Sequence, residues 1–471
     1  MNKPSWFNRL FINSNVFNLF TGQTISQSGD SIFEIALLWM LLELTGSNAA
    51  TGLIAMSGYL PSLLFGLFSG ALVDRFDKRR IMLLADVARA VLVACIPILY
   101  YVGGLNGLIL GLFTFAIASF NTLFNPARDA LVGRIVHSDK QLQANSLIHT
   151  SWQYALFVGP AIAGFLLLFV NEVQLFLVDA LTFLLSFYFI YRLNEHRGVE
   201  ALRHTEREIE LRDTETQRFL GVEHESSETS ETQNAKLWQQ LETLPMEHAE
   251  EVGTVEAKQT KSRRKDIEVV IRESLQDMRE GLAYVKGDKR LLALVLMTIS
   301  NNFFLMGPAV IGAPIFVREI LKKGVESYAF VQIAYGIGMV LGTLLLNYYS
   351  RFFRKSSILL WGIALDGITF LPLLWVTTFE GMFLTLVIHC LAIPMIIVTR
   401  PTIILQLVPS EMQGRVFSMI GVSVQGITAV SIALTGIAAA TVPINVIYAV
   451  IAVAAAMTAL IGASVKELRE L

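Results

Sequence analysis

The chain has 471 residues, of which 54% are hydrophobic and 16% charged, and its formal net charge at pH 7 is −2. This composition is more apolar and less charged than that of an ordinary soluble protein, so it argues against that class and points to a lipid bilayer. The charges are unevenly placed, because 38 of the 76 Asp, Glu, Lys and Arg residues lie between Glu195 and Arg290. Most of the remaining sequence is apolar enough for a membrane.

Twelve apolar stretches follow one another along the chain, each close to the ~20 residues that a helix needs to cross a ~30 Å hydrocarbon core. Lipid cannot satisfy unpaired backbone groups, and the sequence lacks the alternation that a membrane barrel requires, so we predict helices. The expected fold class is an all-α membrane protein with twelve transmembrane helices. The stretches lie near residues 15–43, 50–73, 81–102, 105–126, 146–170, 173–193, 291–317, 328–350, 356–378, 381–400, 416–440 and 443–464.

Basic residues in the short loops predict the orientation. With the N-terminus inside, sixteen Lys and Arg residues fall on the inner side, whereas only Arg318, Lys322 and Lys323 fall on the outer side. This asymmetry predicts a cell-membrane protein with both termini and the 195–290 loop in the cytoplasm. The first stretch has a polar start and no small-residue cleavage site, so we expect it to be a transmembrane helix and not a removed signal peptide.

The sequence contains no pattern typical of an enzyme. A phosphate-binding loop, a nucleophile elbow and a metal-spaced cluster of His or Cys are all missing from it, so we expect no catalytic site, cofactor or metal. Cys95 and Cys390 lie in separate apolar stretches, which gives no indication of a disulfide. We expect no nucleic-acid partner, and the chain is expected to be a monomer in contact with membrane lipid.

The two halves of the chain resemble each other at a fixed offset. Gly342 lies 272 residues after Gly70, and at the same offset "VHSDKQL" (136–142) matches "VPSEMQG" (408–414). Gln425 corresponds in this way to Gln153, and Asn302 to Asp30. The shared offset predicts two six-helix repeats, 1–194 and 291–471, with a cleft between them. The alternative is coincidence among apolar segments of similar composition.

The segment "GALVDRFDKRR" (70–80) joins the second and third stretches on the predicted inner side. It resembles the loop motif of the major facilitator superfamily, and the resemblance implies a cytoplasmic latch that breaks when that side opens. Asp77 replaces the usual glycine, and we expect it to adopt the left-handed conformation, which Asp tolerates. The alternative is simple positive-inside anchoring. The matching residues are Gly70, Asp74, Arg75, Arg79 and Arg80.

Further segments resemble the macrolide-efflux and enterobactin-exporter-like branch of this superfamily. They are "GQTISQSGDSIFEIALLWMLLELTGS" (22–47), "NPARDALVGRIV" (125–136), "ANSL" (144–147), "GPAIAG" (159–164) and "FLVDALTFLLSF" (176–187). The resemblance implies export. "GPAIAG" is similar to the end of an antiporter motif, whereas the fourth stretch lacks the mid-helix arginine of drug/proton antiporters. Arg128, at the inner end of that stretch, is the nearest candidate.

A polar stripe runs along the first predicted helix. Gln23, Gln27, Asp30 and Glu34 are spaced by four, three and four residues, which places them on one helix face. Asp30 lies ~20 Å from the inner end, near the middle of the bilayer. An ionised carboxylate is costly there, so Asp30 and Glu34, with Gln27 beside them, are candidates for proton coupling or substrate binding. The alternative for Asp30 is a hydrogen bond to a neighbouring helix that only stabilises the fold.

Other polar residues in the apolar stretches are weaker candidates. Asp179 is a second candidate for proton coupling, since the first half offers it no obvious basic partner. Asp86 and Arg89 are expected to pair with each other, and Asp366 with His389, which favours a structural role over a proton relay. We expect Gln23, Gln153, Asn302 and Gln425 to line the cleft. With aromatics at Phe124, Phe303 and Tyr335, such a cleft would suit an amphipathic, cationic molecule, although packing is the alternative role for these rings.

The central loop, 195–290, is polar and is expected to be partly disordered. Apolar residues at spacings of three and four predict an amphipathic helix near 266–285 on the inner membrane surface. Together, these features favour proton-coupled efflux of a small amphipathic molecule, such as a drug, macrolide or siderophore, by alternating access. Two alternatives remain: a lysophospholipid flippase, and a non-transporting membrane sensor or scaffold.

Overall fold

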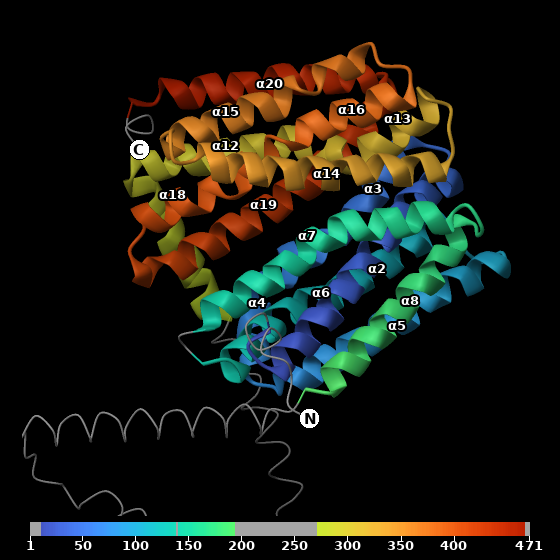
Figure 1. Ribbon diagram of the computed structural model, residues 1–471, viewed down its shortest axis with the longest axis horizontal. Helices are drawn as coiled ribbons and strands as arrows, with labels where there is room; N and C mark the ends of the chain where they lie inside the picture. Colours follow the sequence, from blue (N-terminus) through green and yellow to red (C-terminus); the bar gives the residue numbers. More distant parts are fainter. Residues whose placement is uncertain (1–10, 138–139, 194–270, 467–471) are drawn as a thin grey trace, which may run out of the picture. The chain divides into compact units, whose positions relative to one another are not determined.

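A computed structural model describes residues 11–137, 140–193 and 271–466, and all regular structure in these ranges is helical. The first set of helices consists of α2 (Ser14–Thr45), α3 (Asn48–Ala55), η1 (Met56–Gly58), α4 (Leu60–Asp74), α5 (Lys78–Tyr101), α6 (Gly107–Ile135), α7 (Gln141–Leu166) and α8 (Glu172–Tyr191). The second set consists of α12 (Lys289–Gly307), η3 (Pro308–Gly312), α13 (Ala313–Glu319), α14 (Val325–Tyr349), α15 (Lys355–Ile368), η4 (Leu371–Leu374), α16 (Phe379–Cys390), α17 (Ile393–Ile397), α18 (Thr399–Leu407), α19 (Ser410–Ala439) and α20 (Ile444–Ser464). Figure 1 shows these elements in sequence colours.

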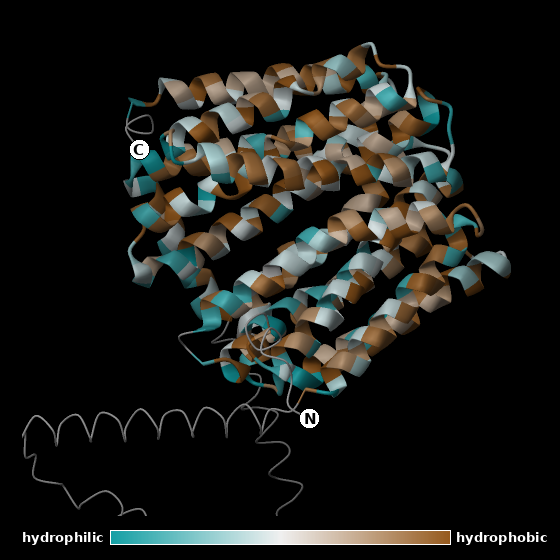
Figure 2. Ribbon diagram, in the orientation of Figure 1, coloured by the Kyte–Doolittle hydropathy of each residue, from teal (hydrophilic) through white to brown (hydrophobic). Residues whose placement is uncertain are grey.

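Ten helical spans among the described residues are long and apolar enough to cross a membrane. The two remaining long helices, α2 and α7, have 32 and 26 residues and are more polar along their length. At 1.5 Å per residue, both exceed the ~30 Å hydrocarbon core. With them the fold has the twelve predicted transmembrane helices, and Figure 2 shows apolar residues along the helices and polar ones concentrated near many of their ends.

The helices repeat at the offset found in the sequence. α6 spans residues 107–135, and α16 to α18 together span 379–407, so both ends differ by 272. α8 begins at Glu172 and α20 at Ile444, again 272 residues apart. The prediction of two six-helix pseudo-repeats is therefore confirmed.

Proline residues mark the interruptions within these spans. Pro61 lies in the first turn of α4, Pro308 in η3, Pro372 in η4 and Pro394 in α17, each where one helical segment ends and the next begins. Proline lacks an N–H and its ring clashes with the preceding turn, which weakens the helix at these positions, whereas Pro97, Pro126 and Pro160 are accommodated inside α5, α6 and α7. These interruptions divide single membrane spans into shorter segments.

Two helices extend further than the apolar stretches indicate. α6 continues to Ile135 and α7 begins at Gln141, whereas most of 127–145 was expected to be loop. The reason is packing: Leu131, Val132 and Ile135 are buried against Val16 and Leu19 of α2. An amphipathic helix end needs only one apolar face, which a search for continuous apolar runs does not detect.

The predicted amphipathic helix near 266–285 lies partly outside the described residues, which are helical over 271–287. Tyr284 and Val285 pack against the core of the second set. Arg415 at the start of α19 forms ion pairs with Asp277 and Glu280, each at 2.7 Å. One face of this segment therefore packs against the second set of helices.

The two sets of helices meet where α3 contacts α19 and where α7 contacts α14. Gly52 and Gly436 allow the first contact, because a Cβ on either would lie within 2.8 Å of the other's Cα. Asn48 Nδ2 donates to the Glu319 carboxylate at 2.8 Å and to the Ala439 carbonyl at 3.0 Å, and Arg318 donates to the Leu42 carbonyl at 2.6 Å. These polar contacts, which we call the clasp, join the sets at the end where α2 and α19 terminate.

Candidate functional site

A cavity of about 640 Å³ lies among the helices of the first set. Polar and apolar side chains from α2, α5, α6 and α7 alternate around it, and Val310 is the one lining residue described from the second set. Its polar and aromatic lining residues include Gln23, Gln27, Asp30, Glu34, Tyr59, Arg89, Asn121, Phe124, Asn125, Arg128 and Trp152.

All four residues of the polar stripe on α2 line this cavity. Hydrogen bonds hold its two amides: Gln23 Oε1 accepts from Arg128 at 3.2 Å and from Gln27 at 3.4 Å, while Gln27 Oε1 accepts from Ser151 at 2.8 Å. One and two turns further along, Asp30 and Glu34 present their carboxyl groups, and the Glu34 side chain is exposed to the cavity. The stripe therefore combines fixed dipoles with two acids.

A buried ion pair lies beside the stripe. Arg89 Nη2 and Asp86 Oδ1 are 2.5 Å apart, and both side chains are at most 2% exposed, which confirms the predicted pairing. The Arg89 guanidinium also lies 4.6 Å from the ring centre of Phe124 and 4.3 Å from that of Phe183. These rings hold the cation in a fixed position by cation–π contact and exclude water from it.

Asp179 lies behind α2 rather than in the cavity lining. It is fully buried on α8, and its Oδ1 accepts from Thr182 Oγ1 at 3.2 Å. A Cβ on Gly29 of α2 would lie 2.4 Å from the same oxygen, so glycine is needed for this close approach. Among the described residues no cation forms an ion pair with Asp179, as the sequence indicated, although Arg89 packs on Phe183 of the same helix.

This cluster of buried charges consists of Asp30, Asp86, Asp179 and Arg89. Of its three acids, only Asp86 forms an ion pair with Arg89 among the described residues, and Asp86 Oδ2 and Asp179 Oδ2 have no hydrogen-bond partner there. Burying an unpaired charge costs several kcal/mol or more, so three ionised carboxylates beside one cation are strongly disfavoured.

Three other predicted cleft residues are not among those lining the cavity. Gln153 is exposed on α7, and Gln425 is half-buried on α19. Asn302 is buried, but its amide donates to the Thr298 carbonyl of its own helix at 2.8 Å. The cavity therefore belongs almost wholly to the first set, in which the repeat carries Asp30 where the second set carries Asn302.

Sequence reasoning missed the contribution of Arg89, Asn121 and Asn125 to the cavity. The spacing from Asn121 to Asn125 and from Asn125 to Arg128 is four and three, which marks one face of α6 and was available as a signal. The approach of Arg89 to Asp30 had no such signal, because it depends on how α5 and α8 pack around α2.

The predicted latch residues lie at the loop between α4 and α5. The expectation of a left-handed Asp77 is wrong: its φ of −64° and ψ of 116° are extended, and its side chain caps α5 by accepting from the Arg80 N–H at 2.7 Å. Arg79 donates to the carbonyls of Ile190 and Tyr191, the last residues of α8, where the helix dipole favours a cation. In this conformation, Arg79 therefore contacts its own set of helices.

The remaining latch residues are more open. Asp74, Arg75 and Arg80 are exposed, and a Cβ on Gly70 would meet nothing within 4 Å. The Asp74 carbonyl accepts from Lys78 Nζ at 2.7 Å. In the second set, the predicted pairing of Asp366 with His389 is confirmed, with 3.5 Å between His389 Nε2 and Asp366 Oδ1.

Comparisons with known proteins agree with this geometry. A family model described as a transmembrane secretion effector matches residues 11–215. Macrolide efflux protein A of Streptococcus pyogenes is 22% identical over 415 residues, which cover 86% of this chain and 84% of that protein. The multidrug efflux pump Tap of Mycolicibacterium fortuitum is 27% identical over 165 residues, 34% of this chain and 40% of that one.

Solved structures share the whole fold at low sequence identity. A bacterial homologue of the iron transporter ferroportin, in an inward-facing state, has a TM-score of 0.65 at 10% identity and covers 96% of this chain and 98% of its own. A bacterial homologue of the human lysosomal transporter Spinster, inward-facing and unoccupied, has a TM-score of 0.61 at 12% identity, with 99% and 97% covered.

Proposed function

We propose that the chain is a transporter of the major facilitator superfamily, similar to its macrolide-efflux branch, and that it exports small amphipathic molecules in exchange for protons. It would then be a multi-pass membrane efflux transporter and not an enzyme, so a chemical reaction of its substrate cannot drive transport. The observation that carries the proposal is the position of Asp30, which lines the cavity together with Arg89, the ion-pair partner of the buried Asp86.

Asp30 is the group that couples the proton to the substrate in this proposal. Its carboxyl group is accessible from the cavity, while Asp86 and Asp179 are fully buried behind it. Since Arg89 can neutralise only one carboxylate, protonation of Asp30 removes a repulsive charge, and loss of that proton restores it. A cation bound in the cavity would compensate the same charge, so proton and substrate compete for one site.

The lining suggests the substrate class. Tyr59, Phe124 and Trp152 offer aromatic surface, and Asp30 and Glu34 offer negative charge in the same 640 Å³ cavity. Aromatic faces and carboxylates both favour organic cations, whereas they disfavour highly charged anions. We therefore propose an amphipathic cation as the exported molecule.

The contacts between the two sets of helices support a proposal of alternating access. With the basic loops in the cytoplasm and both termini on that side, the clasp faces outward, and this conformation is closed to the outside. Release of the substrate then requires the halves 1–194 and 291–471 to rock about the cavity until the contacts of Asn48 and Arg318 separate. The inward-facing states of the similar solved structures support this assignment.

Uptake of a fluorescent cationic dye into inverted membrane vesicles tests the function. We expect accumulation that requires a proton gradient and that disappears in Asp30→Asn, while Glu380→Gln, which alters an exposed acid, retains it. Accumulation that ignores both the gradient and the Asp30 substitution would overturn proton coupling. Transport of lysophospholipid independent of pH would instead favour a flippase, and absence of any transport would favour a sensor.

A further inference from the structure

A second cavity, of about 520 Å³, lies at the surface of the second set of helices. It shares no lining residue with the first cavity. α14, α15, α16 and α17 contribute its walls, which are almost wholly apolar. Leu345, Tyr349, Phe353 and Trp361 line this groove and are also 45–65% exposed, so the groove faces the surroundings of the protein. In a membrane, those surroundings are lipid.

The backbone of α14 and of the segment between α16 and α17 contributes to the groove. Gly342 of α14 lies so close to the segment between α16 and α17 that a Cβ would be 2.5 Å from the Leu391 carbonyl. α16 ends at Cys390, and Pro394 in the first turn of α17 cannot donate a backbone hydrogen bond. Leu391 and Ala392, at this interruption, line the groove. The residues of this interruption and side chains such as Leu345 and Trp361 therefore line the groove together.

Its length suits one lipid acyl chain. Lining residues on α15 and its end run from Ser357 to Thr369, twelve residues, or ~18 Å along a helix. One leaflet contributes about half of the ~30 Å hydrocarbon core. An acyl chain that enters beside Ser357 would therefore reach the middle of the bilayer within the groove.

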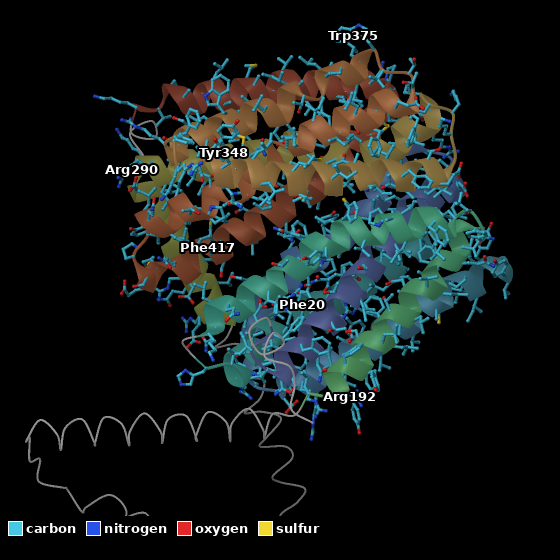
Figure 3. The ribbon with its side chains drawn as sticks, viewed as in Figure 1. Phe20, Arg192, Arg290, Tyr348, Trp375 and Phe417 are labelled. Carbon is cyan, nitrogen blue, oxygen red and sulfur yellow. The ribbon has the colours of Figure 1, made fainter. Side chains whose placement is uncertain are left out.

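Three cations are sequence neighbours of the residues that line one end of the groove. Arg351, Arg354 and Lys355 alternate in sequence with Ser350, Phe353 and Ser357, which line it. The Arg351 guanidinium lies 4.7 Å from the ring centre of Tyr348, which Figure 3 labels on α14, and 4.9 Å from that of Phe352. Within the described part of the chain, no carboxylate forms an ion pair with any of these cations. The first turn of α15, which follows Arg354 and has no side-chain cap, adds positive charge.

We propose that this groove binds one anionic glycerophospholipid, with an acyl chain along α15 and its phosphate on Arg351, Arg354 and Lys355. An apolar groove alone would accept any lipid, whereas cations without acidic partners favour a headgroup with net negative charge over a zwitterionic one. The lipid would hold α14, α15 and the α16–α17 interruption together at the cytoplasmic end of the second half.

Native mass spectrometry of the full-length protein, released from nanodiscs of equal phosphatidylglycerol and phosphatidylcholine, tests the proposal. We expect one retained phosphatidylglycerol per protein, with its affinity about fivefold lower for each cation removed in Arg351→Gln and Arg354→Gln. Arg192→Gln is the matched control, since Arg192 similarly lies 5.0 Å from the ring centre of Tyr188 but follows α8 and lines neither of the two cavities.

A second pair of variants tests the groove without altering charge. Leu345→Trp fills the groove and should abolish retention, whereas Leu344→Trp, on the neighbouring exposed position outside it, should not. Equal retention of both lipids, or a preference that survives both arginine substitutions, would overturn the proposal in favour of ordinary surrounding lipid. A protein dimer without bound lipid would overturn it too. If Leu345→Trp does not fold, the charge variants still decide the result.

Discussion

Gly52 and Gly436 face each other across the contact between α3 and α19, where a Cβ on Gly436 would lie 2.7 Å from the Gly52 Cα and 2.6 Å from the Asn48 carbonyl. Neither neighbour is a flexible side chain, so a larger residue can be accommodated only by separating the two helices. Positions 52 and 436 must therefore both be glycine for α3 and α19 to pack this closely.

Gly436→Val should block the closure of this end and reduce transport at least tenfold. Overpacking of this kind costs about 1–3 kcal/mol, which the fold can tolerate while the conformation with α3 against α19 cannot form. Dye accumulation in vesicles measures the effect, with Val430→Phe, an enlargement on an exposed position of α19, as the control. Equal transport by the two variants would contradict this view of the contact.

Loss of the clasp should favour opening toward the outside. Arg318→Gln removes the 2.6 Å bond to the Leu42 carbonyl, and a hydrogen bond is worth about 1 kcal/mol, which corresponds to about a fivefold shift in population. We expect a cysteine placed by Leu37→Cys in the cavity to react about fivefold faster with an impermeant maleimide added outside. Lys323→Gln should leave the rate unchanged, and an unchanged rate in Arg318→Gln would exclude a role for the clasp in closure.

Removal of Arg89 should destabilise the protein more than removal of the whole ion pair. Arg89→Gln leaves the buried Asp86 without its cation, a loss of about 3–5 kcal/mol, whereas Asp86→Asn combined with Arg89→Gln removes both charges. Unfolding of the detergent-solubilised protein should therefore show the double variant to be the more stable one. Additive losses in this double-mutant cycle would indicate that the two side chains do not interact.

Asp288 provides a pH-dependent cap at the start of α12. Hydrogen bonds from the Arg290 side chain, and then from the backbone N–H groups of Arg290 and Leu291, hold the pKa of Asp288 below its usual value. The folded state thus favours the ionised form, so this stabilisation is present above the unfolded pKa of about 3.9 and disappears as the pH falls through the lower folded value.

Asp288→Ala should accordingly lower the free energy of unfolding by about 1 kcal/mol at neutral pH, and the difference from wild type should shrink as the pH falls below about 4. Asp288→Asn retains a capping oxygen and should lose less, with little dependence on pH. Denaturation measured across this range tests the prediction. A deficit in Asp288→Ala that is constant with pH would show that ionisation of the cap does not contribute.

The twelve spans and the repeat could be predicted because both depend on local composition and on a constant offset. The Asp86–Arg89 pair could be predicted because three-residue spacing places both side chains on one helix face. The position of Asp179 relative to Arg89 could not, since it depends on the rotation of α5 and α8 about α2 and on the absence of a side chain at Gly29. Helix register alone also placed Gln153 and Asn302 in the cleft. Register does not show that Gln153 lies on an exposed face or that the Asn302 amide bonds within its own helix.

Gly436 and Gly164 are 272 residues apart, and each allows its own helix to pack against the other half, Gly436 against Gly52 and Gly164 against the ring of Phe330. The same offset relates α7 to α19 and the α3–α4 span to α14. The contacts of α3 with α19 and of α14 with α7 are thus two copies of one surface pairing, as in an isologous dimer whose subunits have been joined into a single polypeptide. If the proposed rocking preserves this symmetry, both contacts separate together, and we expect a substitution in either one to affect the same opening.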